Sequence, residues 1–134
     1  MQMAKSVGAE VTGVDSTEKL EIMHSLGADN LIDYTQEDFT KNGQSYDLII
    51  DMAAHHSIFD YKRSLCSVGI FVLVGGSTLR VNQLLLLGPF FSIIGSKKMG
   101  LLLHKANKGL DLMKKLLESG KVVPVIDRCY QLSE

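Results

Sequence analysis

The pattern of apolar and polar positions predicts short strands that alternate with helices along the chain. Apolar runs at residues 10–14, 30–33, 46–51, 69–74 and 90–95 are bounded by glycine or polar residues, as is typical of strands. Most of these runs are apolar without in–out alternation. We therefore expect them to be buried on both faces, as the strands of parallel sheets are.

Capping residues and apolar spacing predict the helices between these strands. Ser16 or Thr17 can cap a helix that ends at Gly27, and Ser57 can cap the next helix in an approximate capping box with Asp60. The remaining expected segments are a helix end at 1–7 closed by Gly8, a long helix over about 101–119 closed by Gly120, and an extended segment at 122–126. This alternation predicts a doubly wound α/β fold, in which helices cover both faces of a parallel sheet.

Composition narrows the class of protein without identifying it. With 134 residues, 46% of them hydrophobic, the chain is expected to form at most one globular domain. A net charge of −1 excludes nucleic acid as an expected partner, because no basic surplus neutralises phosphates. No apolar stretch is long enough to predict a membrane span. Two cysteines, Cys66 and Cys129, are too few for a disulfide framework, so we expect reduced thiols and a cytoplasmic location.

Polar residues suited to a nucleotide follow the strand predicted at 10–14. Asp15, Ser16, Thr17 and Lys19 gather at its carboxyl end, where ligands bind in open α/β sheets. An acidic residue there accepts hydrogen bonds from a ribose, which favours NAD. Hydroxyl groups and a lysine instead suit the 2′-phosphate of NADP. The alternative is that a hydroxyl of this group only caps the following helix while the lysine is solvated.

Six segments occur in one order along nearly the whole chain: 4–14, 25–34, 46–51, 72–77, 95–100 and 123–128. Together they resemble the cofactor domain of the medium-chain dehydrogenase/reductase superfamily, in its zinc-binding alcohol dehydrogenase and quinone oxidoreductase-like branch. The resemblance implies a Rossmann-like sheet that binds NAD(P). It also implies an oxidoreductase that transfers hydride between the nicotinamide and a carbonyl or quinone, with a slight preference for NADP over NAD.

In that family a catalytic domain, a first strand and a glycine-rich loop precede the position matched by residue 1. We therefore expect an incomplete Rossmann-like sheet over residues 1–126, with 127–134 starting the return segment to the catalytic domain. Because the first strand lies centrally, its absence should leave two half-sheets whose edges could pair in a homodimer or with another chain. Such a fragment is expected to be inactive alone. The alternatives are a non-enzymatic assembly module and a non-functional truncated product.

The resemblance also implies further contacts with the cofactor. The residues concerned are Tyr34 beside the 2′-phosphate of NADP, Ala53 and Ala54 near the adenine and its ribose, Gly75, Gly76 and Ser77 along the nicotinamide, and Ser96 and Lys97 near the nicotinamide ribose after the last strand. A flexible turn at the glycines and a solvated pair at Lys97–Lys98 are the alternatives. No catalytic residue is visible. His55 and His56 lack a third ligand at a suitable spacing, so no metal site and no zinc are expected in this chain.

Overall fold

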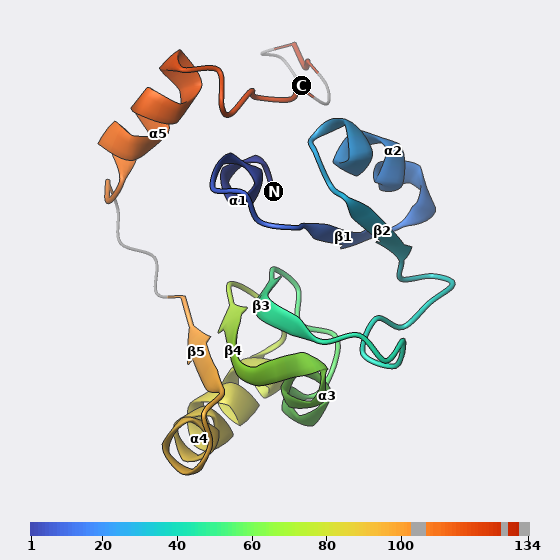
Figure 1. Cartoon of the computed structure of the whole chain (residues 1–134), viewed down its shortest axis with the longest axis vertical. Coiled ribbons are helices and arrows are strands. Elements are labelled where there is room, and N and C mark those ends of the chain that lie inside the picture. The colour runs from blue at the N-terminus through green and yellow to red at the C-terminus, as the bar shows by residue number, and fades with distance from the viewer. Residues whose placement is uncertain (103–106, 127–128, 132–134) are drawn as a thin grey trace. The chain divides into compact units, whose positions relative to one another are not determined.

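A computed structural model describes residues 1–102, 107–126 and 129–131. The chain divides into two compact units, one formed by residues 1–33 with the C-terminal part and the other by residues 34–105. The first unit contains a two-stranded sheet and the second a three-stranded sheet, and all neighbouring strands are parallel (Figure 1). The prediction of two parallel half-sheets is thereby confirmed. Within the described ranges, no helix has the length and apolar content that crossing a membrane requires.

The first unit is a strand–helix–strand motif with two further helices. Its elements are α1 (Gln2–Ser6), β1 (Thr12–Asp15), α2 (Thr17–Ser25), β2 (Asn30–Asp33) and α5 (Leu110–Glu118). The helix ends predicted at Gly8 and Gly27 are confirmed, because these glycines follow α1 and α2 with φ of 81° and 92°. In the sheet, Asp15 lies beside Asp33, so both strands end on a carboxylate at the same edge.

The long helix predicted over 101–119 is wrong in its first half. Residue 101 ends a strand, residues 103–106 lie outside the described part, and α5 begins only after Gly109, which is left-handed with a φ of 84°. The predicted end is confirmed, because α5 stops just before Gly120. The segment at 122–126 joins neither sheet, although the Gln2 side chain donates to the carbonyl of Val123 and accepts from its amide, at 2.9 and 2.6 Å.

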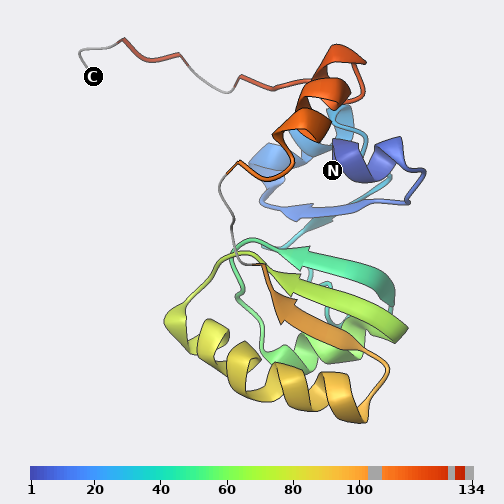
Figure 2. The ribbon, with the colours of Figure 1, turned by 90° about the vertical axis from the view of Figure 1, so that its left-hand side faces the viewer.

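The second unit packs two helices against three strands. Its elements are β3 (Tyr46–Asp51), α3 (Ile58–Ser64), β4 (Leu65–Leu73), α4 (Thr78–Ile94) and β5 (Lys98–Leu101), and the sheet has the order β3-β4-β5. The capping box predicted at α3 is confirmed, with Ser57 and Asp60 bonded to each other's amides. Both helices lie on the same face of the sheet, as consecutive right-handed crossovers require (Figure 2).

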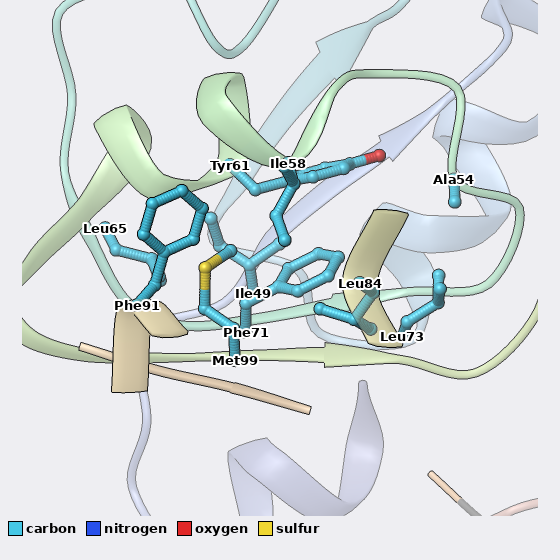
Figure 3. Packing of buried hydrophobic residues seen from close by; sticks show 10 residues of the cluster. All are labelled: Ile49, Ala54, Ile58, Tyr61, Leu65, Phe71, Leu73, Leu84, Phe91 and Met99. Atoms are coloured by element: carbon cyan, nitrogen blue, oxygen red, sulfur yellow. The ribbon is translucent and has the colours of Figure 1, made fainter. Parts of the chain in front are cut away.

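The core of the second unit lies between this face of the sheet and the two helices. Tyr61, Phe71 and Leu73 are its most deeply buried large side chains. These three belong to one contiguous cluster of ten buried residues, which Figure 3 draws: Ile49, Ala54, Ile58, Tyr61, Leu65, Phe71, Leu73, Leu84, Phe91 and Met99. The core therefore fixes the strand ends and the loops that follow them.

The strand predicted at 90–95 is wrong, because these residues belong to the end of α4. Pro89, which directly precedes that run, also lies inside the helix. Proline removes one helical hydrogen bond, here to the carbonyl of Leu85, which lies on the exposed side of the helix. Apolar side chains on both sides of it, Leu84 and Phe91, pack into the core and hold the helix together through this defect.

The burial expected for β3 is also wrong on one face. Ile49 points into the core, but Leu48 and Ile50 are 53% and 58% exposed on the opposite face, where Ile70 of β4 is 41% exposed. Both helices of this unit cover the Ile49 face. An apolar run can therefore predict a strand correctly even where the helices of the same unit cover only one face of that strand.

Candidate functional site

The carboxyl end of β1 gathers three of the residues predicted to contact a nucleotide. One oxygen of Asp15, Oδ1, accepts from the backbone amide of Ser16 at 2.8 Å and from its hydroxyl at 3.4 Å. The ammonium group of Lys19 lies 3.9 Å from the same oxygen. The Lys19 side chain is 66% exposed, so this ion pair contributes little stability and the lysine can turn toward another anion.

The alternative of a hydroxyl cap on α2 is wrong. Ser16 occupies the N-cap position, yet no side chain there bonds a helix amide. The hydroxyl of Thr17 instead donates to Oδ2 of Asp33, the residue beside Asp15 in the sheet. Tyr34 follows directly in the sequence and is 60% exposed. The hydroxyl groups of Ser16 and Thr17 are therefore bonded to carboxylates rather than to the amides of the helix.

This corner carries two carboxylates, Asp15 and Asp33, and one lysine. Carboxylate oxygens can accept from ribose hydroxyls, which suits either cofactor at the sugar and NAD at the 2′ position. A 2′-phosphate would be attracted by Lys19 and repelled by Asp15. The geometry of this corner therefore fits NAD and NADP alike, which are the two alternatives that the sequence predicts.

In the second unit, the loop after β3 is organised by a carboxylate. Oδ1 of Asp51 accepts from the backbone amides of Ala53 and Ala54 at 2.8 and 2.7 Å. Ala54 has a φ of 45°, which residues with a side chain rarely adopt, and it is 4% exposed. Asp51 therefore holds the two alanines that the resemblance implies at the cofactor.

The loop after β4 packs directly against the loop after β3. A Cβ added at Gly75 would lie 2.7 Å from the carbonyl oxygen of Met52, and one added at Gly76 would lie 2.7 Å from Cβ of Ala54. These glycines are needed for that close approach, so the alternative of a merely flexible turn is insufficient. Ser77 follows at the N-cap position of α4, again without a side-chain cap bond.

Tyr61 was not singled out from the sequence, although it anchors the same loop. Its hydroxyl donates to Oδ2 of Asp51 and accepts from the amide of His56 at 3.2 Å. Burial raises the pKa of Tyr61, and the hydrogen bond to Asp51 raises it further, so the phenol stays protonated. The spacing of apolar residues can predict that a tyrosine lies in the core, but only the fold shows which groups its hydroxyl bonds.

Ser96 and Lys97 do not follow the last strand, as was expected, but precede it. They lie between α4 and the start of β5, at the edge of the parallel sheet opposite Gly75. The Lys97 ammonium donates to the carbonyls of Lys62 and Leu65 at 2.8 Å each, and the Ser96 hydroxyl donates to another backbone carbonyl. Lys97 is therefore not simply solvated, and the fold does not group it with the other candidates.

The second of the two histidines after β3 lies among aromatic and acidic side chains. His56 packs edge-on against Phe39 and Tyr61, with Nε2 3.8 Å from Oδ1 of Asp38. A hydrogen bond from Thr40 lowers the pKa of Asp38, against an opposing effect of burial. Among the described residues, no group of three or more histidine, cysteine, aspartate or glutamate side chains could hold a metal ion.

Comparisons with known proteins place the chain among dehydrogenases and reductases of one family. A family model described as zinc-binding dehydrogenase matches residues 26–134. A chloroplastic NADPH-dependent alkenal/one oxidoreductase of Arabidopsis thaliana is 31% identical over 132 residues, and a 2-methylene-furan-3-one reductase of Solanum lycopersicum is 34% identical over 129 residues. Each alignment covers 95% of this chain but 29% of the relative. The chain thus spans less than a third of the length of these relatives.

Solved structures show the same architecture. The structure of a quinone oxidoreductase from Coxiella burnetii aligns with a TM-score of 0.77 and 26% identity, over 98% of this chain and 40% of that one. The structure of AibC aligns with a TM-score of 0.73 at 22% identity, which shows a likeness of fold alone. The expected α/β fold with parallel sheets is therefore confirmed.

Proposed function

The chain belongs to the zinc-binding dehydrogenase family, and we propose that it is the NAD(P)-binding part of an oxidoreductase of the alcohol dehydrogenase and quinone reductase type. The resemblance drawn from six sequence segments is confirmed by these relatives. The proposed reaction is hydride transfer between the nicotinamide and a carbonyl or quinone. In that reaction the cofactor supplies the hydride, and this chain binds and orients the cofactor.

The observation that carries the proposal is the arrangement of polar groups at the carboxyl ends of parallel strands, where α/β folds bind nucleotides. In the first unit, Asp15, Ser16 and Lys19 meet around one carboxylate oxygen. We assign this corner, with Thr17 and Tyr34, to the adenosine ribose and its 2′ substituent.

In the second unit, the packed loops after β3 and β4 present backbone rather than bulky side chains. We assign Ala53 and Ala54 to the adenine side of the cofactor and Gly75, Gly76 and Ser77 to the nicotinamide side. Ser96 and Lys97 are left out of this assignment, because they lie at the opposite edge of the sheet.

NADP is the proposed cofactor, with NAD as the alternative. An exposed Lys19 beside a serine hydroxyl favours NADP, and one of the relatives is an NADPH-dependent enzyme by name. We propose that the chain does not turn over by itself, since the relatives are about three times its length. The free thiols of Cys66 and Cys129 fit the proposed cytoplasmic location.

The test is a titration of the ¹⁵N-labelled chain with NADPH, NADH and adenosine in parallel, followed by amide NMR shifts. We expect saturable shifts at residues 15–19 and 75–77 with both dinucleotides, larger at Lys19 with NADPH, and weaker than millimolar affinity. Adenosine is the matched control, because it lacks the phosphates and the nicotinamide. Shifts scattered over the surface without saturation would refute the proposal.

A second candidate function is assembly through strand edges. Within the described residues, β1 and β3 are each bonded to one neighbouring strand only, and exposed strand edges invite pairing with another chain. Light scattering coupled to size-exclusion chromatography tests it. A concentration-dependent dimer favours assembly, and a stable monomer at all concentrations contradicts it.

A further inference from the structure

One buried side chain closes the loop after β3 at both of its ends. The hydroxyl of Tyr61 donates to Asp51, where the loop begins, and accepts from the amide of His56 at 3.2 Å, where the loop ends. A phenol has a single O–H to donate and lone pairs that accept, so both of its hydrogen-bonding functions serve this loop. Tyr61 comes from α3, outside the loop that it ties together.

The position of this hydroxyl is set by the core and not by the loop. Tyr61 is 2% exposed, and its ring is stacked on Phe71 of β4 with the centroids 4.3 Å apart. Figure 3 shows the Tyr61 ring lying over Phe71, with its hydroxyl on the side where Ala54 lies. A ring held in this way keeps its oxygen at one point, because core side chains are closely packed and occupy single rotamers.

The loop requires an anchor of this kind, because its backbone is strained. Ala54 has a φ of 45°, and such a conformation persists at a residue with a side chain only where the surroundings hold it. Oδ1 of Asp51 holds the amides of Ala53 and Ala54, while Oδ2 of the same carboxylate is held by Tyr61. The chain of contacts therefore runs from the core, through one carboxylate, to the strained backbone.

We propose that Tyr61 is a positioning residue for the cofactor: through Asp51 it holds the backbone of Ala53 and Ala54 in the conformation that receives the dinucleotide. The inference rests on the proposed function, which assigns those two alanines to the cofactor. Tyr61 itself contacts neither the cofactor nor the reacting atoms in this account. Its effect is to keep the loop in one conformation before binding, which lowers the entropy lost on binding.

The test compares Tyr61→Phe with Tyr46→Phe in the full chain. The first change removes only the anchoring oxygen and keeps the ring on Phe71. The second removes a hydroxyl from another tyrosine of the same unit whose oxygen is buried without a hydrogen-bond partner among the described residues. The two variants thus lose the same atom, one with a role in the loop and one without.

Two quantities are measured on each variant: hydrogen exchange of the amides of Ala53 and Ala54, and the affinity for NADPH from amide shifts. For Tyr61→Phe we expect exchange at both amides to rise about tenfold and to stay insensitive to low urea, because the loop opens locally and not with the whole unit. We expect NADPH affinity to fall about three- to tenfold, since the ordering of the loop would then be lost on binding. Tyr46→Phe should change neither quantity.

The outcomes separate the inference from the function on which it rests. Faster loop exchange with weaker NADPH binding in Tyr61→Phe alone supports the positioning role. Saturable binding that is equal in the unsubstituted chain and in Tyr61→Phe overturns the inference and leaves the proposed function standing. Exchange at Ala53 and Ala54 that rises with low urea as exchange of the β4 amides does also overturns it, because the loop would then open only with the whole unit. Absence of saturable binding by the unsubstituted chain overturns the proposed function itself.

Discussion

The same substitution should change stability very differently at two tyrosines of the second unit. Tyr61→Phe removes a hydroxyl that bonds the carboxylate of Asp51 and the amide of His56. A hydrogen bond to a charged group contributes about 1.5–3 kcal/mol, and its loss leaves both partners less well satisfied in a partly buried place. We therefore expect the free energy of unfolding to fall by about 2 kcal/mol.

Tyr46→Phe removes a buried hydroxyl that has no partner in the described part of the chain. Burial of such a group costs about 1 kcal/mol or more, so its removal should leave the unit equally stable or raise the free energy of unfolding by about 1 kcal/mol. In both variants the ring remains, and the apolar contacts of Tyr46 with Phe39 and of Tyr61 with Phe71 are retained.

Urea unfolding followed by far-ultraviolet circular dichroism measures both changes. The slope of free energy against urea should stay constant, so that the shift of the midpoint reports stability alone. A unit of the size of residues 34–105 loses about 4–8 °C of melting temperature per kcal/mol, so a difference of about 2–3 kcal/mol puts the two variants about 8–24 °C apart. Equal effects of the same sign would refute the reasoning, because hydrogen-bond partners would then not decide the outcome.

Three further predictions concern the cofactor corner, acid stability and the glycine loop. Asp15→Asn should raise the affinity for NADP relative to NAD by about fivefold and Lys19→Ala should lower it similarly, as about 1 kcal/mol of surface electrostatics allows; competition binding measures the ratio. Asp38 has a lowered pKa in the folded chain, so its stabilising effect is present above the ordinary value of 3.8 and is lost as the pH falls below it. Asp38→Asn should therefore reduce the acid-induced loss of unfolding free energy, which urea midpoints at successive pH values report. Gly76→Ala, with a φ of 148° and an added carbon 2.7 Å from a neighbouring side chain, should cost about 2 kcal/mol or more. Gly100→Ala meets no heavy atom within 4 Å and should change the urea midpoint little, so similar effects of the two glycine variants would contradict the packing argument.

Much of the fold was predictable because local signals agree with one another. The ranges 30–33 and 46–51 match β2 and β3, and the capping box of Ser57 with Asp60 gives the start of α3. Apolar runs and capping residues are properties of a few neighbouring residues, so the sequence carries them directly. The split into two parallel half-sheets followed from the family resemblance, in which the central first strand precedes the position matched by residue 1.

The errors arose where packing overrides a local signal. The run at 90–95 predicts a strand, yet α4 continues through Pro89 into this run because its apolar residues pack on β5 and β4. Moving the last strand from 90–95 to Lys98–Leu101 also moved Lys97 from the end of a strand to its beginning. One wrongly assigned strand was therefore enough to place Lys97 at the wrong edge of the sheet.

The candidate site was predictable in its residue types but not in its bonds. The cluster at Asp15 and Lys19 follows from sequence, because both lie within one turn of the strand end. Tyr61 and Asp51 are ten residues apart on different elements, and their contact depends on how α3 packs against the sheet that contains β3 and β4. Contacts of this kind require the fold.

The central claim is that the carboxyl ends of these strands receive a nicotinamide dinucleotide, and contacts between protons of the chain and of the cofactor test it most directly. Intermolecular nuclear Overhauser effects should be recorded on the ¹⁵N- and ¹³C-labelled chain with saturating NADPH. The account predicts effects from the adenosine ribose to Ser16 and Thr17 and from the nicotinamide ring to Gly75–Ser77. Effects that connect the cofactor only to residues outside these strand ends would contradict it.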